Sequence, residues 1–258
     1  MTLRLDALSV GYRRHTVLTG LSAVAGRGEL TILLGPNGVG KSTMIRALAG
    51  LQPPLSGGMS LDGADLTRLS TTERARRIAV VLTERVSPGL LTGRELVSFG
   101  RHPHTGFTGA LGQRDRDVVA WALDVVDATH LADRDLSEVS DGERQRLLTA
   151  RALAQEPDLL LLDEPSAFLD APSRVALMGL LRRLATERDL AIVVSTHEVE
   201  LALRLADTAW LIDAHGTLHT GTPQQLVSDG TVSAVFDTEQ LRFDPVSGTF
   251  EPRERLPA

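Results

Sequence analysis

A short glycine-rich segment combines the residue types that bind phosphate groups. Residues 35–43 read Gly35-Pro36-Asn37-Gly38-Val39-Gly40-Lys41-Ser42-Thr43. This run fits the pattern G-x-x-x-x-G-K-[ST], in which backbone N–H groups surround phosphate oxygens. Lys41 is the only lysine among 27 lysine and arginine residues, and its compact ammonium suits a tight loop better than the planar fork of arginine. We expect Lys41 to contact the β- and γ-phosphates of a nucleotide, and the Ser42 hydroxyl to bind Mg²⁺.

The sequence on either side of this loop supports a phosphate site. Residues 30–34 form a short apolar run that predicts a buried parallel strand. Residues 42–49 predict a helix that ends at Gly50. In this order of strand, glycine loop and helix, the N-terminus of the helix would point at an anion bound by the loop. The alternative is a glycine-rich turn that contains a lysine by chance.

An acidic pair follows a second apolar run. Residues 159–162 are four leucines, and Asp163 and Glu164 come directly after them. Acidic residues at the carboxyl end of a buried strand lie where open α/β sheets bind ligands. We expect Asp163 to hold Mg²⁺, commonly through water, and Glu164 to accept the proton of the water that attacks the γ-phosphate. Two solvated acids at a plain strand end are the alternative.

A histidine follows a third apolar run. Residues 191–194 predict a buried strand, and His197 comes shortly after it. A histidine at this place can hydrogen-bond the γ-phosphate and orient the attacking water. On its own a histidine after a strand has little weight, but its order after Asp163 and Glu164 favours this role.

Composition limits the class of protein. The chain of 258 residues is 42% hydrophobic and 23% charged, as in an ordinary globular protein. Its net charge of −6 disfavours nucleic acid as a partner, since nucleic-acid-binding proteins usually carry a basic excess. There is no cysteine, no apolar run near the roughly 20 residues of a membrane span, and no signal-peptide pattern. We therefore expect a cytoplasmic protein that reaches a membrane only through a partner.

The order of the predicted elements indicates an α/β fold. Residues 1–30 read as short strands with a turn near Gly20, and further strands are predicted at 56–63 and 78–82. Helical sequence occupies about 86–155, and residues 211–218 read as a hairpin. A strand-rich core interrupted by helices and then resumed predicts an α/β core with a smaller helical lobe.

These ordered motifs resemble the ATP-binding cassette ATPases over about residues 2–250. The glycine loop is similar to Walker A, residues 159–164 to Walker B with its catalytic glutamate, and residues 166–170 to the D-loop. His197 matches the switch histidine of the family. Tyr12, the only tyrosine, lies where the family stacks an aromatic ring on adenine. A strand residue at the edge of the core is the alternative for Tyr12.

Two elements depart from the family pattern. The signature, usually L-S-G-G-Q, here contains Ser140, Asp141 and Gly142. The resemblance implies that Ser140 and the Gly142 amide reach the γ-phosphate of an ATP held by the opposite subunit, while Asp141 adds a negative charge there. Glu84 replaces the Q-loop glutamine, a contact to Mg²⁺, and can still accept a hydrogen bond from a metal-bound water.

The helical insert and the tail narrow the resemblance to importers of iron–siderophore, haem and cobalamin type. Residues 91–106 are similar to the segment that follows the Q-loop in that group, and residues 241–251 to its C-terminal hairpin. His102 and His104 in the insert are expected on the surface near the membrane subunit rather than at a metal, and His215 and His219 in a hairpin.

The resemblance implies a P-loop NTPase core with a mixed, RecA-like sheet, an N-terminal antiparallel β part and an inserted α-helical lobe. Its single domain would span 1–250, with the core at 1–85 and 156–250, the lobe at about 86–155 and a tail at 251–258. It implies ATP and Mg²⁺ as cofactors and two cassettes that sandwich two ATP molecules.

The partners follow from the same resemblance. They are a second copy of the chain, two integral-membrane permease subunits on whose cytoplasmic side the cassettes sit, and indirectly an extracytoplasmic substrate-binding protein, with no nucleic acid. A cassette ATPase that acts on DNA or ribosomes, and a regulatory subunit that barely hydrolyses ATP, remain the alternatives.

Overall fold

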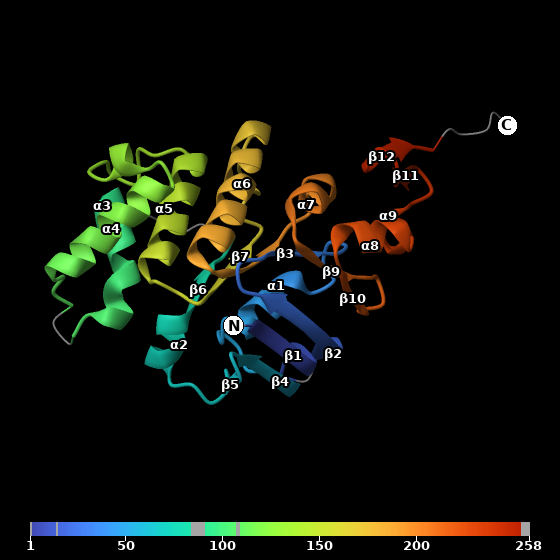
Figure 1. Ribbon diagram of the computed structural model, residues 1–258, viewed down its shortest axis with the longest axis horizontal. Helices are drawn as coiled ribbons and strands as arrows, with labels where there is room; N and C mark the ends of the chain where they lie inside the picture. The colour runs from blue at the N-terminus through green and yellow to red at the C-terminus, as the bar shows by residue number, and fades with distance from the viewer. Residues whose placement is uncertain (1, 14, 84–90, 107–108, 254–258) are drawn as a thin grey trace. The chain divides into compact units, whose positions relative to one another are not determined.

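The computed structural model describes residues 2–13, 15–83, 91–106 and 109–253 (Figure 1). The chain forms two compact units, the first made of Met1–Thr67 with Leu181–Ala258 and the second of Arg68–Leu180. Each unit is described below by itself. The second unit is longer than the lobe predicted at 86–155, because it also contains α2, β6, β7 and part of α6. The division into a core and a lobe at those bounds stays a prediction.

The first unit contains strands of three sheets and several short helices. Its first part comprises β1 (Thr2–Tyr12), β2 (His15–Gly26), β3 (Leu30–Leu34), α1 (Lys41–Leu48), β4 (Ser56–Leu61) and β5 (Ala64–Asp65). Its second part comprises β8 (Ala191–Ser195), α7 (Val199–Leu205), β9 (Thr208–Ile212), β10 (Leu218–Gly221), α8 (Pro223–Ser228), α9 (Thr231–Phe236), β11 (Leu241–Asp244) and β12 (Thr249–Pro252). The predicted strand at 30–34 and the helix after the glycine loop are confirmed, and so is the C-terminal hairpin, formed by β11 and β12.

The central strand of the first unit is β3. It pairs in parallel with β8 on one side and with β9 on the other, and β10 continues antiparallel from β9. All five residues of β3 and all five of β8 are buried, which explains why both read as continuous apolar runs. Because β3 and β8 are parallel neighbours, the loops that follow them leave the same edge of the sheet.

The N-terminal strands form an antiparallel sheet in the order β2-β1-β4-β5. The predicted turn near Gly20 is wrong, because β2 runs through this residue without a break. Gly20 has φ +67 and lies at a shift of the β1–β2 register, between the pairs Leu8↔Leu21 and Val10↔Leu18. The glycine therefore serves a bulge within the strand, which needs the same positive φ as a turn.

The turn between β9 and β10 depends on the carboxylate of Asp213. The backbone N–H groups of His215 and Thr217 donate to its Oδ1 at 2.8 and 2.9 Å, and Nε2 of His219 lies 3.1 Å from its Oδ2. Burial alone would raise the pKa of Asp213. The hydrogen bonds from Thr217, His219 and His215 outweigh burial and lower that pKa from 3.8 to about 2.

We expect Asp213→Asn to lower the free energy of unfolding by about 1–2 kcal/mol at about pH 6, after allowance for solvent screening. Since the pKa is lower in the folded state, this contribution is complete above the unfolded pKa of 3.8 and is lost as the pH falls towards 2. Denaturant unfolding of wild type and variant between about pH 6 and pH 3 measures the difference in their free energies of unfolding. This difference should fall to roughly half at pH 3. A difference that stays constant over this range would contradict the role of the carboxylate.

The second unit combines a strand pair with helices. It comprises α2 (Thr71–Arg77), β6 (Ile78–Val81), α3 (Gly93–Ser98), η1 (Phe99–His104), α4 (Gln113–Val125), η2 (Thr129–Leu131), α5 (Asp141–Ala154), β7 (Leu159–Asp163) and the larger part of α6 (Ala171–Arg188). Strands β6 and β7 pair in parallel, with Val81 opposite Leu162. Helix α5 packs against both α3 and α4 (Figure 1). Most of its residues from Leu147 onwards are buried, because this half carries the apolar side chains.

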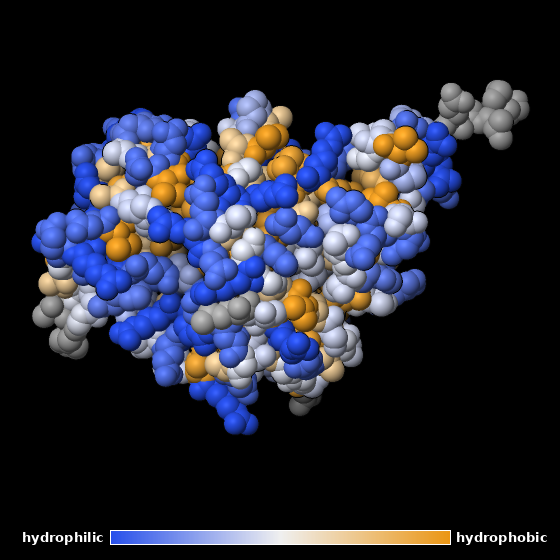
Figure 2. Space-filling view, viewed as in Figure 1, coloured by the Kyte–Doolittle hydropathy of each residue, from blue (hydrophilic) through white to orange (hydrophobic). Residues whose placement is uncertain are grey.

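The visible face in Figure 2 carries hydrophobic side chains in small groups between hydrophilic ones. Such scattered apolar residues are normal on a globular surface. Within the described ranges, no helix has the length and hydropathy to cross a membrane.

Candidate functional site

The glycine loop and its flanks have the geometry of an anion-binding turn. Strand β3 ends at Leu34, and α1 begins at Lys41 after Gly40, which has φ +115. Among the described residues, no side chain caps the N-terminus of α1, and the first turn of this helix contains no acidic residue. The first N–H groups of a helix have no partner within the helix, so they and the positive end of the dipole favour an anion here.

Gly35 occupies a position that no other residue fits. Its φ is +152, and a Cβ added there would lie 2.6 Å from the carbonyl oxygen of Ile212 and 3.1 Å from Cγ1 of Val39. The loop can therefore leave β3 beside β9 only because this residue lacks a side chain.

We expect Gly35→Ala to destabilise the protein by about 1–3 kcal/mol, since both the backbone and the Ile212 carbonyl must shift. Gly179→Ala is the matched control. Gly179 lies exposed within α6, and an added Cβ would meet nothing within 4 Å. The control should gain about 0.5–1 kcal/mol from its helix propensity. Denaturant unfolding compares the two, and a Gly35→Ala variant as stable as wild type would contradict the argument.

Lys41 is buried although it carries a charge. Only 7% of the residue is exposed, and its Nζ donates to the carbonyl oxygens of Gly35 at 2.9 Å and Pro36 at 3.4 Å. The loop therefore folds around its own lysine and places the ammonium among carbonyl oxygens. Ser42, the next residue, is exposed and presents its hydroxyl at the start of α1.

Tyr12 lies beside the end of the glycine loop. Tyr12 ends β1 and is 55% exposed. Its hydroxyl accepts a hydrogen bond from Oγ1 of Thr43 at 3.3 Å. The aromatic ring is thus joined to the first turn of α1 while remaining open to solvent. This arrangement suits a ring that stacks on a base, although that role stays a prediction.

His197 follows the carboxyl end of β8. The Thr196 N–H donates to the carbonyl oxygen of Leu33 at 3.2 Å, so the chain after β8 remains beside β3 as the glycine loop begins. The His197 side chain is 49% exposed, with Nε2 3.4 Å from Oε1 of Glu198. Within the first unit, Tyr12 therefore contacts the end of the glycine loop, and the segment before His197 lies beside the start of that loop.

The acidic pair belongs to the second unit. Asp163 ends β7 and is only 5% exposed, and its carbonyl oxygen accepts a hydrogen bond from Oγ1 of Thr83 at 2.7 Å. Glu164 has φ +49, an uncommon value for a residue with a side chain. A bond of 3.1 Å from the Ala167 N–H to the Glu164 carbonyl oxygen closes the turn that fixes this conformation.

The signature residues form the start of α5. Ser140 is its N-cap, and its Oγ accepts from the Glu143 N–H at 3.3 Å. Oε2 of Glu143 in turn accepts from both the N–H and the hydroxyl of Ser140 at 2.8 Å, and these bonds lower the pKa of Glu143. Gly142 follows in the first turn. Sequence reasoning missed the role of Glu143, although S-x-x-E is the spacing of a capping box.

The segment 91–106 is fixed by a buried arginine. Arg101 is 2% exposed, and its guanidinium reaches Oδ1 of Asp115 at 2.9 Å, Oε2 of Glu156 at 2.8 Å and the carbonyl oxygen of Ala154 at 2.7 Å. Because a buried charge is costly without partners, these bonds hold η1 against α4 and the end of α5. Phe99 remains 42% exposed on η1.

The two histidines of the insert both contact neighbouring residues. The ring centroid of His102 lies 5.2 Å from that of Phe99. Nε2 of His104 lies 2.8 Å from the carbonyl oxygen of Gln155. Among the residues described, no three His, Cys, Asp or Glu side chains form a metal-binding group. Glu84, predicted as a metal contact, lies outside the described residues.

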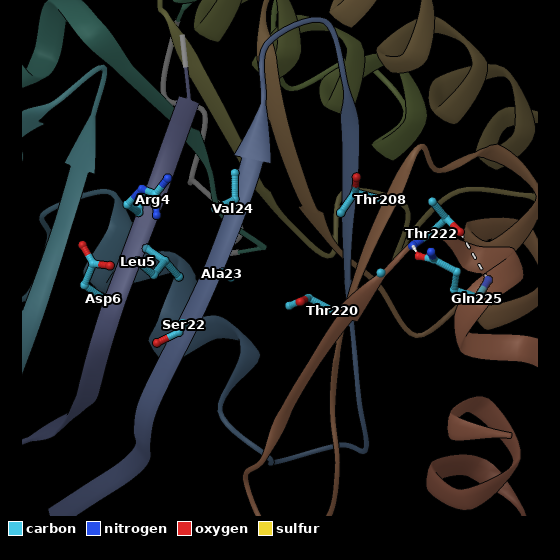
Figure 3. Close-up of a pocket in the computed structure, with 11 residues that line it drawn as sticks. Arg4, Leu5, Asp6, Ser22, Ala23, Val24, Thr208, Thr220, Thr222 and Gln225 are labelled. Atoms are coloured by element: carbon cyan, nitrogen blue, oxygen red, sulfur yellow. Dashed lines mark hydrogen bonds between the residues drawn. The ribbon is translucent and has the colours of Figure 1, made fainter. Parts of the chain in front are cut away.

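A pocket of about 510 Å³ in the first unit is lined by residues outside these motifs (Figure 3). Strands β1 and β2 form one wall through residues such as Arg4 and Ser22, while Thr220 and Gln225 come from β10 and α8. It contains none of the predicted nucleotide-binding residues, so it is not the candidate site.

Comparisons with known proteins agree with the motifs. The family model for ABC transporters matches residues 18–167. The uncharacterized ABC transporter ATP-binding protein MJ0873 of Methanocaldococcus jannaschii is 43% identical over 249 residues, which cover 96% of this chain and 86% of the relative. The ferric enterobactin transport ATP-binding protein FepC of Escherichia coli is 34% identical over 248 residues, covering 96% and 92%. Other relatives are named as siderophore, iron(3+)-hydroxamate and cobalamin ATP-binding proteins.

A solved structure extends the comparison to the fold. The dimeric bacterial ABC transporter cassette MJ0796 superposes with a TM-score of 0.74 at 25% identity, over 86% of this chain and 98% of that one. The predicted P-loop fold is therefore confirmed. Since the family model covers more than half of the chain and these relatives span nearly all of it, the chain belongs to the ATP-binding cassette transporter family and is an ATPase subunit that resembles those of iron–siderophore and cobalamin importers.

Proposed function

We propose that this chain couples the binding and hydrolysis of ATP to the uptake of an iron–siderophore or related metal chelate. The buried Lys41 within a loop that ends at an uncapped helix is the observation that carries the proposal. The relatives named for ferric enterobactin and siderophore transport support the class of cargo. The cargo itself would not touch this subunit.

Each predicted site residue has a proposed task. The N–H groups of residues 35–43 bind the phosphates, Lys41 and His197 contact the γ-phosphate, and Tyr12 stacks on adenine. Glu164 accepts the proton of the attacking water. Positioning and electrostatic stabilisation contribute most of the catalysis in such reactions, so the fixed backbone around Glu164 supports this assignment.

The donor groups at hand fit Mg²⁺. The exposed hydroxyl of Ser42 and the carboxylate of Asp163 are hard oxygen ligands of the kind that this ion prefers. When bound, the ion neutralises charge on the β- and γ-phosphate oxygens. We propose that Ser42 and Asp163 hold it, with Glu84 accepting a hydrogen bond from one of its waters.

We propose that two copies of the chain sandwich two ATP molecules, with Ser140 and Gly142 of each copy facing the ATP of the other. The likeness to a dimeric cassette supports this assembly. ATP then acts as a ligand that favours the closed pair. The pair would sit on the cytoplasmic side of two permease subunits, docked through residues 91–106, where Phe99 is exposed. An extracytoplasmic substrate-binding protein would deliver the cargo.

A pull-down from solubilised native membranes tests the proposal. Tagged Glu164→Gln protein is used with ATP present, so that bound nucleotide persists, and co-purified proteins are identified by mass spectrometry. We expect a polytopic membrane protein, and a substrate-binding protein encoded beside it would narrow the cargo. Recovery of ribosomes or DNA-repair proteins without any membrane protein would overturn the transport function and leave only the ATPase chemistry.

A further inference from the structure

A small cavity within the second unit lies beside Glu164. Its volume is about 30 Å³, enough for about one or two water molecules. The walls come from the start of the predicted Q-loop, the first turns of α5 and the segment after β7: Leu82, Thr83, Asp141, Arg144, Gln145, Leu148, Glu164 and Phe168. The cavity therefore borders three motifs that ATP hydrolysis is proposed to use, yet none of the predicted roles accounts for it.

Gln145 lines this cavity and carries a buried polar atom that the predicted roles do not explain. Its Nε2 is buried and has no hydrogen-bond partner among the described residues. A buried amide N–H without a partner is costly, so native structures usually satisfy such groups, often with an internal water. The cavity supplies both the space and the polar neighbours that a water needs.

The polar groups around the cavity can offer one water three hydrogen bonds. The water would accept a hydrogen bond from Nε2 of Gln145 and donate to the carboxylate of Glu164 and to Oγ1 of Thr83. Oγ1 of Thr83 already donates its proton to the Asp163 carbonyl oxygen at 2.7 Å, so it has a lone pair to offer rather than a proton. The donors and acceptors are thus matched.

We propose that this cavity is an internal water site and that Gln145 is a positioning residue for Glu164. Gln145 would act through the water, which holds the carboxylate of the proposed base in one orientation. The backbone of Glu164 has φ +49, and a hydrogen bond from the water would contribute to holding its side chain in one rotamer. The signature helix α5 would thereby influence the hydrolysis step within its own subunit. This inference rests on the proposed role of Glu164.

The test compares Gln145→Met with wild type in steady-state ATP hydrolysis by the full-length protein. Methionine has a similar length but donates no hydrogen bond. We expect kcat to fall about tenfold, as for the loss of one hydrogen bond, while KM for ATP stays within about twofold.

Gln113→Met is the matched control, because Gln113 is exposed on α4 and its amide contacts only Asp117 among the described groups. It should leave both kcat and KM for ATP unchanged. A Gln145→Met enzyme with wild-type kcat, or one whose KM alone changes, would overturn the positioning role. Thermal unfolding checks that each variant is folded.

The double variant separates this inference from the proposed function. In the Glu164→Gln background, Gln145→Met should lower the residual rate no further, since the group it positions is gone. If Glu164→Gln is inactive but Gln145→Met is not impaired, the positioning role fails and Glu164 remains the base. If Glu164→Gln retains the wild-type rate, the proposed function of Glu164 fails instead.

A crystal structure of the wild-type protein provides a readout independent of activity and of any variant that does not fold. We expect density for a water within hydrogen-bonding distance of the Gln145 amide and of Glu164. A dry cavity, or a Gln145 amide bound to another protein group, would overturn the water site.

Discussion

Replacing Lys41 with arginine should lower ATP hydrolysis by about 10²-fold or more, although the charge is unchanged. Lys41 is 7% exposed, and its ammonium donates to two carbonyl oxygens of its own loop, at 2.9 and 3.4 Å. A guanidinium is wider and directs its donors in a fixed plane, so it cannot enter the same space and reach the same phosphate oxygens. Measured kcat and nucleotide affinity of Lys41→Arg and Lys41→Ala separate the effect of shape from that of charge.

Arg46→Lys makes the reverse exchange in the same helix and serves as the control. Arg46 lies in the last turn of α1, where either cation suits the negative end of the helix dipole. Its rate should stay within about twofold of wild type. A Lys41→Arg enzyme as active as this control would show that the loop does not distinguish the two cations.

Replacing Glu164 with glutamine should lower kcat by about 10²–10⁴-fold while ATP binding is retained. The amide keeps the size of the carboxylate but cannot take a proton from water. Since ATP persists, the variant should form dimers with ATP that wild type loses as it hydrolyses. Single-turnover hydrolysis, equilibrium ATP binding and size-exclusion chromatography with and without ATP measure the three effects.

Glu187→Gln is a suitable control, because Glu187 is exposed in the last turns of α6. Its kinetics should match wild type. If Glu164→Gln turned over ATP at nearly the control rate, another group would have to be the base. If it lost ATP binding as well, Glu164 would be needed for the fold of the site rather than for the proton transfer.

Local sequence was sufficient for the elements whose geometry is set by near neighbours. The run from Leu30 to Leu34, the glycines after it and the helix from Lys41 follow one another directly, so residue types alone predicted strand, loop and helix. The same holds for β7 and its acidic end. Both strands are buried on two faces and are therefore apolar throughout, which makes them easy to detect.

Features that depend on distant partners could not be predicted this way. The sequence around Gly20 predicts a turn, because bulges and turns need the same positive φ and only the pairing of β1 with β2 distinguishes them. Gln145 has no local signal, since the cavity that makes it unusual also involves residues about 60 positions before it and 20 after it. The role of Glu143 is the exception, because the capping-box spacing S-x-x-E is a local signal.

The buried lysine also has a practical consequence for labelling chemistry. Reagents that modify primary amines have two kinds of target in a protein, the N-terminal α-amino group and lysine side chains, and this chain offers only Lys41 in the second class. Acylation of its Nζ would report on access to the nucleotide loop, and protection by ATP would appear as one missing mass shift on one peptide. Coupling to a sensor surface through amines would conversely capture either the chain end or a protein modified at Lys41. Immobilisation through another residue type is therefore preferable for binding studies.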